Sequence, residues 1–147
     1  MAAAQEVTIT RVFDAPRRLV WEAWTDPGQL AAWWGARGWS ADPARLTMDV
    51  RPGGVFSLTS VSEDGREMPQ EGIYREVVEP ERLVIEESAK GNWHEGSEIA
   101  VTFTDLGDDR TEVVLHGTIN TTEEMARMAM GGMSETIERL AEHLAAR

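Results

Sequence analysis

VWEAWTDP, residues 20–27, carries two tryptophans, and WWG at residues 33–35 and Trp39 bring the number within twenty residues to five of the chain's six. Each indole ring can bury roughly 150–250 Å² and adds one N–H group that needs an acceptor. So much rigid aromatic surface must pack against a large apolar face or line a cavity. This segment therefore indicates binding more directly than it indicates catalysis.

Short elements surround these tryptophans. Residues 6–13 alternate β-branched and polar side chains and end at DAP (14–16), a pattern that predicts a strand leading into a helix with proline in its first turn. The DP pair at 26–27 offers an N-cap and a first-turn proline for a second short helix that ends near Gly35. Two short helices are therefore expected after the first strand.

The tryptophans differ in their expected burial. Trp21 and Trp24 are three residues apart on one predicted helix, so both are expected to pack in the core. Trp33 and Trp34 are adjacent and point in different directions, so at most one of them is expected to be deeply buried. Trp39 is equally compatible with contact to a ligand across a cavity mouth and with ordinary packing.

Residues 44–119 change in character, because runs of β-branched residues alternate with turn signatures such as PGG at 52–54 and EDG at 63–65. These intervals predict six further antiparallel strands, which makes seven in all. Their expected positions are 45–50, 55–61, 72–78, 83–88, 97–104 and 112–118.

The last segment predicts one long helix. Thr121 followed by Glu124 matches a capping box, in which each side chain satisfies a free backbone N–H group. The glycine pair at 131–132 allows two interpretations, the close approach of a neighbouring element or a soft point at which the helix could lift. An apolar stripe with helical spacing continues nearly to the C-terminus, through Ala126, Met130, Met133, Ile137, Leu140 and Leu144.

One strand, two short helices, six strands and a long terminal helix leave few compact arrangements. The arrangement that buries every apolar face is an α+β fold, in which a strongly bent, seven-stranded antiparallel sheet surrounds the terminal helix. Neither a linker nor a repeat divides the chain, so residues 5–146 are expected to form a single domain.

Several spaced motifs, in the right order and over almost the whole chain, resemble those of the activator of heat-shock-protein-90 ATPase homologue family. They are VWEAWTDP (20–27), WWG (33–35), DVRPGG (49–54), DG (64–65), GIYREVVEPERL (72–83), VTF (101–103) and IERL (137–140). The family belongs to the START-like (SRPBCC), polyketide-cyclase-like superfamily, and the resemblance implies a helix-grip fold whose sheet and terminal helix enclose a deep cavity. That superfamily includes lipid and hormone binders, cyclases, antibiotic-sequestering proteins and a co-chaperone domain, so the resemblance leaves the activity open.

One position departs from the pattern of the family. Where the family usually carries a Gly-Trp pair in the last helix, this chain has Gly132-Met133. A flexible thioether there replaces a rigid ring, and Met125, Met128 and Met130 add further adaptable surface to the same helix. The resemblance therefore implies a cavity of changed shape.

Composition argues against several classes of function. The 147 residues include 26 acidic and 14 basic side chains, and the formal charge of −12 disfavours nucleic acid and anionic membrane surfaces as partners. The sequence has neither a stretch apolar enough to span a membrane nor a secretory signal, so a cytoplasmic location is expected. With no cysteine and three dispersed histidines, neither a metal nor another cofactor is expected.

Few titratable side chains are candidates for proton transfer. Glu87 is in phase with the inward-facing residues of its strand, but a solvated strand end is the favoured interpretation and a polar anchor inside a cavity is the alternative. Tyr74 and His116 are expected to face outward. His94, next to Trp93 in a glycine-flanked loop, would suit an aromatic ligand, although an exposed hairpin tip is the favoured interpretation.

The predicted function is non-catalytic binding of a small hydrophobic or aromatic molecule between the sheet and the terminal helix. Two alternatives stay open: a co-chaperone-like module that stimulates a chaperone ATPase, and a cyclase or aromatase-type enzyme that uses His94, a pocket glutamate or, as a weaker candidate, Tyr74. Both a monomer and a homodimer are compatible with the sequence. Strand alternation, helix phase and ring size give the expected lining residues, which are Trp39, Phe56, Leu58, Ile85, Trp93, Val101, Phe103, Met125, Ala129 and Met133.

Overall fold

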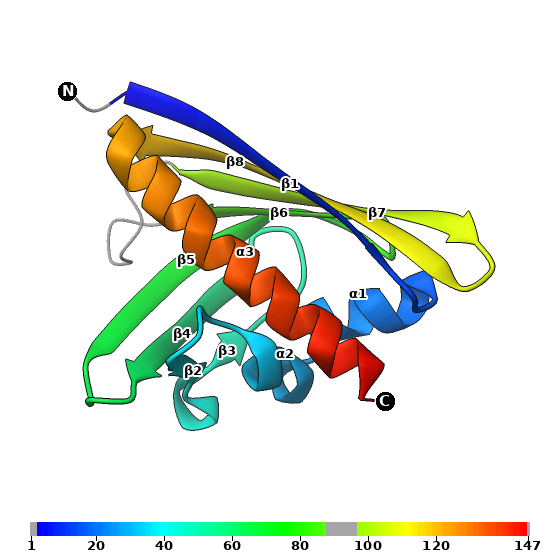
Figure 1. Cartoon of the computed structure of the whole chain (residues 1–147), viewed down its shortest axis with the longest axis horizontal. Coiled ribbons are helices and arrows are strands. Elements are labelled where there is room, and N and C mark those ends of the chain that lie inside the picture. The colour runs from blue at the N-terminus through cyan, green and yellow to red at the C-terminus, as the bar shows by residue number, and fades with distance from the viewer. Residues whose placement is uncertain (1–2, 88–96, 147) are drawn as a thin grey trace.

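A bent antiparallel sheet forms most of the protein in a computed structural model that describes residues 3–87 and 97–146 (Figure 1). Seven strands follow one another across the sheet in the order β1-β8-β7-β6-β5-β4-β2, and β3 pairs with β4. The strands are β1 (Ala3–Phe13), β2 (Trp39–Ala41), β3 (Thr47–Met48), β4 (Val55–Ser62), β5 (Glu67–Val78), β6 (Arg82–Glu87), β7 (Glu98–Gly107) and β8 (Arg110–Thr121).

The long helix α3 (Glu123–Ala145) crosses the inner side of this sheet (Figure 1). The short helices α1 (Arg17–Thr25) and α2 (Pro27–Trp33) lie near the C-terminal end of α3 and contact it. Both follow the first strand, as the proline positions predicted. The expected α+β helix-grip architecture is confirmed.

The region between residues 39 and 50 differs from the expected strand pattern. The predicted strand at 45–50 is present only as the two-residue β3, because Asp42 and Pro43 start a 3-10 turn, η1 (Pro43–Arg45). The Asp42 side chain caps this turn by accepting a hydrogen bond from the Ala44 N–H at 2.9 Å. The seventh place across the sheet belongs instead to β2, which pairs with the end of β4.

A bulge in β5 reverses the direction of one aromatic side chain. The register with β6 shifts just after Tyr74, so Tyr74 lies opposite Ile85 and Val77 lies opposite Leu83. Residues three apart thus face the same side, whereas regular alternation would place them on opposite sides. The expectation that Tyr74 faces outward is wrong, since its ring is buried and contacts Phe56 edge to face with 6.0 Å between ring centroids.

The tryptophan-rich segment forms the centre of the core. Trp21 and Trp24 are buried, as expected, and both contact Phe103 of β7 edge to face. Trp33 and Trp34 are buried together, with 0% and 6% of their surface exposed, so the expectation that at most one would be deeply buried is wrong. Trp33 ends α2 and Trp34 follows with an extended backbone, which turns the two adjacent rings toward different parts of one core.

Helix α3 begins one residue later than predicted. Its N-cap is Thr122, whose Oγ1 accepts a hydrogen bond from the backbone N–H of Met125 at 3.2 Å. Thr121 still belongs to β8, so the predicted capping box between Thr121 and Glu124 is wrong. Because adjacent threonines can both cap a helix, the end of the preceding strand decides which of them does so.

Close packing does not explain the glycine pair in α3. Among the described residues, a Cβ atom added at Gly131 would meet nothing within 4 Å, and one added at Gly132 would meet the Ala36 Cβ at 3.9 Å, an ordinary contact. The helix continues through both glycines without interruption. Gly132 borders a cavity, where the missing side chain leaves space.

Candidate functional site

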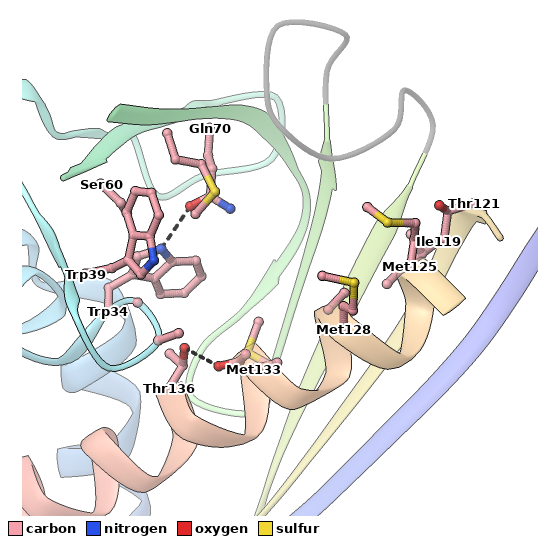
Figure 2. A pocket seen from close by; sticks show the side chains of 15 residues that line it. Trp34, Trp39, Ser60, Gln70, Ile119, Thr121, Met125, Met128, Met133 and Thr136 are labelled. Atoms are coloured by element: carbon pink, nitrogen blue, oxygen red, sulfur yellow. Dashed lines mark hydrogen bonds between the residues drawn. The ribbon is translucent and has the colours of Figure 1, made fainter. Parts of the chain in front are cut away.

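A cavity of about 410 Å³ lies between α3 and the inner face of the sheet (Figure 2). Its walls come from β4 and β5, the end of β8, residues 125–136 of α3 and the loop between α2 and β2. Cavities of roughly 300–1,000 Å³ are typical of small-molecule sites. The lining residues are Trp34, Gly35, Ala36, Trp39, Ser60, Met68, Gln70, Ile119, Thr121, Met125, Met128, Ala129, Gly132, Met133 and Thr136.

Regular spacing within each element brings these residues together. In the register of β4 with β5, Ser60 lies opposite Met68 and Leu58 lies opposite Gln70, so Ser60, Met68 and Gln70 share the inner face of the sheet. The contributors from α3 are three or four residues apart and therefore share one face of the helix. They are Met125, Met128, Ala129, Gly132, Met133 and Thr136.

Arg139 ties the loop between α2 and β2 to α3. Its guanidinium group donates hydrogen bonds to four backbone carbonyl oxygens: 3.2 Å to Trp34, 2.9 Å to Gly35, 2.9 Å to Trp39 and 3.4 Å to Ala32. Gly35 has a φ of +108°, a left-handed conformation that favours glycine. The arginine thereby holds in place the wall that carries Trp34 and Trp39.

Four polar side chains line the cavity, and none of its lining side chains is charged. The Gln70 Oε1 accepts a hydrogen bond from the Trp34 Nε1–H at 3.1 Å. The Thr136 Oγ1 donates to the helix backbone four residues earlier at 2.9 Å. The Ser60 Oγ is fully buried and has no hydrogen-bond partner among the described residues. Thr121, at the end of β8, is the fourth polar residue.

The first turns of α3 form the exposed edge of the cavity. Met125 and Met128 keep 50% and 65% of their surface exposed, whereas Met133, farther along the helix, is buried. In Figure 2 these two methionines lie at one end of the cavity, and Trp34 and Trp39 lie at the other. A ligand that covered the two methionines would remove apolar surface from water, which stabilises a complex by about 25 cal/mol per Å².

Nine of the ten predicted lining residues lie in the described part of the chain, and they divide into two groups. Four of the ten lie on the cavity: Trp39, Met125, Ala129 and Met133. Five others face inward, as strand alternation predicted, but are packed in the core and do not border the cavity: Phe56, Leu58, Ile85, Val101 and Phe103. Tryptophan rings take up the space beside them, since Trp34 contacts Phe56 and Trp21 contacts Phe103. Trp93 lies outside the described residues.

The lining residues that the sheet contributes were not predicted from the sequence. Ser60 is in phase with Phe56, which was expected to face inward, so the alternation of β4 already contained the signal for Ser60. Met68 and Gln70 lie in β5, which begins well before the strand predicted at 72–78. Pro69 obscures this extension, because proline cannot donate a hydrogen bond to a neighbouring strand.

Glu87 is buried inside the protein, so the favoured expectation of a solvated strand end is wrong. Only 4% of its surface is exposed, and its Oε2 has no hydrogen-bond partner among the described residues. Burial raises the pKa of this carboxyl to about 8, so the group is largely protonated at neutral pH. Burial also raises the pKa of the Tyr74 hydroxyl. Neither residue lines the cavity.

The other titratable candidates lie away from the cavity or outside the described residues. His116 faces outward, as expected, 3.0 Å from the Thr8 Oγ1 and 3.2 Å from the Glu6 Oε1. His94 falls outside the described residues. Residues 3–87 and 97–146 contain no cluster of three or more His, Cys, Asp or Glu side chains that could hold a metal ion. Among the helices of these ranges, none combines the length and the apolar composition that a membrane-spanning helix requires.

Several solved structures have the same fold. An AHSA1 protein from Silicibacter pomeroyi is 18% identical, with a TM-score of 0.85 over 97% of this chain and 99% of that one. A protein from Nitrosomonas europaea is 24% identical, with a TM-score of 0.81 over 96% and 94% of the two chains. An AHSA1-like protein from Aeromonas hydrophila is 22% identical, with a TM-score of 0.81 over 97% and 93%. A comparison with curated protein sequences found no significant match.

Sequence comparison with protein families gives a match over nearly the whole chain. The family described as Activator of Hsp90 ATPase homolog 1-like protein matches residues 14–145, from the end of β1 to the last residue of α3. This range contains the two short helices, the remaining strands of the sheet and the terminal helix. The chain therefore belongs to the Activator of Hsp90 ATPase homolog 1-like family, which has a START-like fold.

Proposed function

We propose that this protein binds a small, largely apolar molecule in the cavity between α3 and the sheet and does not transform it. The observation that carries the proposal is an uncharged cavity of about 410 Å³ with four methionines and two tryptophans on its walls. Methionine side chains adapt to irregular apolar shapes, and tryptophan offers a flat ring for stacking. Such walls suit a hydrophobic or aromatic ligand.

The chemistry of the walls favours binding over catalysis. Nucleophilic and acid–base catalysis require a reactive or titratable side chain near the reacting atoms. The lining residues include neither a histidine nor a carboxylate, and Glu87 and Tyr74 lie elsewhere on the inner face of the sheet. Within the part of the chain that the structure describes, the walls therefore supply contacts for a ligand but no group that could carry a proton.

A fluorescent probe and a variant that fills the cavity test this proposal. N-phenyl-1-naphthylamine is uncharged, and its emission increases in apolar surroundings. We expect saturable binding to the wild-type protein. Ala129→Phe places a ring in the cavity and should weaken this binding by about tenfold or more, because the ring competes for the same volume.

Ala145→Phe is the matched control, since Ala145 is exposed at the end of α3 and does not line the cavity. It should bind the probe as the wild type does, and circular dichroism should show both variants folded. Absence of saturable binding to the wild type would contradict the proposal. Equal affinity of the wild type and a folded Ala129→Phe variant would place the probe elsewhere and would contradict it as well.

A further inference from the structure

Two of the four polar side chains of the cavity lie together at one of its ends. Ser60 and Gln70 lie on the sheet near Trp34 and Trp39, while Met125 and Met128 lie at the opposite end (Figure 2). The register of β4 with β5 pairs Ser60 with Met68, two residues from Gln70 on the same face. Ser60 and Gln70 are therefore diagonal neighbours, whose side chains can reach one common group.

The hydrogen bond from Trp34 fixes the orientation of the Gln70 amide. An indole N–H can only donate, so the atom that it contacts at 3.1 Å must be the amide oxygen of Gln70. The amide nitrogen then points away from Trp34 with two hydrogens to donate. It donates to no group among the described residues, so it is free to bind an acceptor on a ligand.

The hydroxyl group of Ser60 supplies a second hydrogen-bond donor on the same wall. Its side chain is completely buried, and its Oγ has no hydrogen-bond partner among the described residues. A buried polar group without a partner is unfavourable, and an acceptor on a ligand would satisfy it. Ser60 and Gln70 together thus provide donors at one end of a cavity that is otherwise mainly apolar.

The absence of charged side chains on the cavity walls also restricts the charge of the ligand. The whole chain carries a formal charge of −12, yet the lining residues include no acidic or basic side chain. A charged ligand would lose its hydration without gaining a counterion, which is strongly unfavourable. The occupant that these walls suit is therefore uncharged.

We propose that the ligand is an uncharged molecule with an apolar body and one hydrogen-bond-accepting oxygen of the carbonyl type. The oxygen binds between Ser60 and Gln70, and the apolar body extends along Trp39 toward Met125 and Met128. This inference rests on the proposed function, because it assigns the chemistry of a ligand in the same cavity. It adds the polar contact that orients the ligand.

A matched set of naphthalene compounds tests the inference by equilibrium dialysis. 2-Acetylnaphthalene carries a ketone, 2-ethylnaphthalene replaces it with a hydrocarbon group, and 2-naphthoate carries a charge. A ketone is more strongly hydrated than a hydrocarbon, so the two compounds differ in affinity even without a specific contact. The quantity to compare between wild type and variant is therefore the ratio of the affinity for 2-acetylnaphthalene to the affinity for 2-ethylnaphthalene. Ser60→Ala and Gln70→Met remove one donor each, and Ser57→Ala on the same strand, outside the cavity lining, is the matched control.

We expect the ketone-to-hydrocarbon affinity ratio to fall by about tenfold in Ser60→Ala, with a similar fall in Gln70→Met. Affinity for the hydrocarbon should be unchanged in Ser60→Ala, and naphthoate should bind least to the wild type. An unchanged ratio in both variants, or naphthoate as the tightest ligand, would overturn the inference while leaving the proposed function intact. If neither uncharged compound binds the wild type, the proposed function and the inference both fail.

Discussion

The position of Glu87 in the fold changes the pKa of its side chain. Its neighbour Glu86 projects from the other face of β6 and lies 3.6 Å from the Arg75 guanidinium, whereas Glu87 is enclosed by the protein. Burial disfavours the charged carboxylate and raises the pKa of Glu87 to about 8. The fold therefore holds Glu87 as a neutral carboxylic acid, although its sequence neighbour Glu86 lies beside an arginine on the other face of the strand.

The raised pKa of Glu87 predicts a specific pH dependence of stability. In the unfolded chain the carboxyl has a pKa near 4.5, and in the folded protein it has a pKa of about 8. Between these values the folded state keeps a proton that the unfolded state releases, so the free energy of unfolding falls as the pH rises. The slope from this group reaches about 1.4 kcal/mol per pH unit. Glu87→Gln should remove this contribution and be more stable than the wild type at pH 8.

Urea denaturation of the two proteins at several pH values between about 5 and 8 measures this difference. Glu86→Gln is the matched control, because this neighbour is partly exposed and faces the other side of the strand. It should retain the pH dependence of the wild type. If Glu87→Gln and the wild type lose stability in parallel as the pH rises, Glu87 is ionised in the folded protein and its assignment as a neutral acid is wrong.

At the scale of elements, the loop between α2 and β2 depends on α3 for its shape. Arg139 donates to carbonyl oxygens on both sides of the loop. Arg37, at its tip, donates its backbone N–H to Glu135 at 3.0 Å and its side chain to Glu142. One helix thus forms a wall of the cavity directly and fixes a second wall through hydrogen bonds.

Arg139→Ala should therefore destabilise the protein and loosen this loop. Hydrogen bonds that involve a charged group contribute about 1.5–3 kcal/mol, and the loss of the guanidinium should lower the free energy of unfolding by about that amount. Amide hydrogen exchange should accelerate at Trp39, whose N–H donates to the Ala36 carbonyl within the loop. The same two measurements on Arg127→Ala, an exposed arginine of α3, should match the wild type. Unchanged stability and unchanged exchange in Arg139→Ala would show that the loop holds its shape without the arginine.

In the molecule as a whole, the charged side chains that the structure describes lie outside the cavity. The excess of acidic side chains lies outside a cavity whose lining carries no charge. Structures that share 18–24% of their residues with this chain keep the same backbone arrangement, with TM-scores of 0.81 and 0.85. The backbone arrangement is therefore shared at low sequence identity.

The sequence predicted the architecture better than the site. Helical spacing in α3 placed Met125, Ala129 and Met133 correctly on the cavity, because a helix keeps its phase over many residues. Strand phase was less reliable: the bulge after Tyr74 reverses it, and Pro69 hides the start of β5. Periodicity also cannot show which part of an inward face other side chains fill, so Phe103 was assigned to the cavity although Trp21 and Trp24 cover it.

Methionine-methyl NMR can show directly whether a small apolar molecule occupies the cavity between α3 and the sheet. Protein labelled with [methyl-¹³C]methionine reports on the four lining methionines, Met68, Met125, Met128 and Met133. Met48 of β3 does not line the cavity and serves as an internal reference. On titration with N-phenyl-1-naphthylamine, we predict saturable shifts of the four lining signals and none at Met48. Unchanged lining signals, or a shift at Met48 as large as theirs, would show that the molecule does not bind in this cavity.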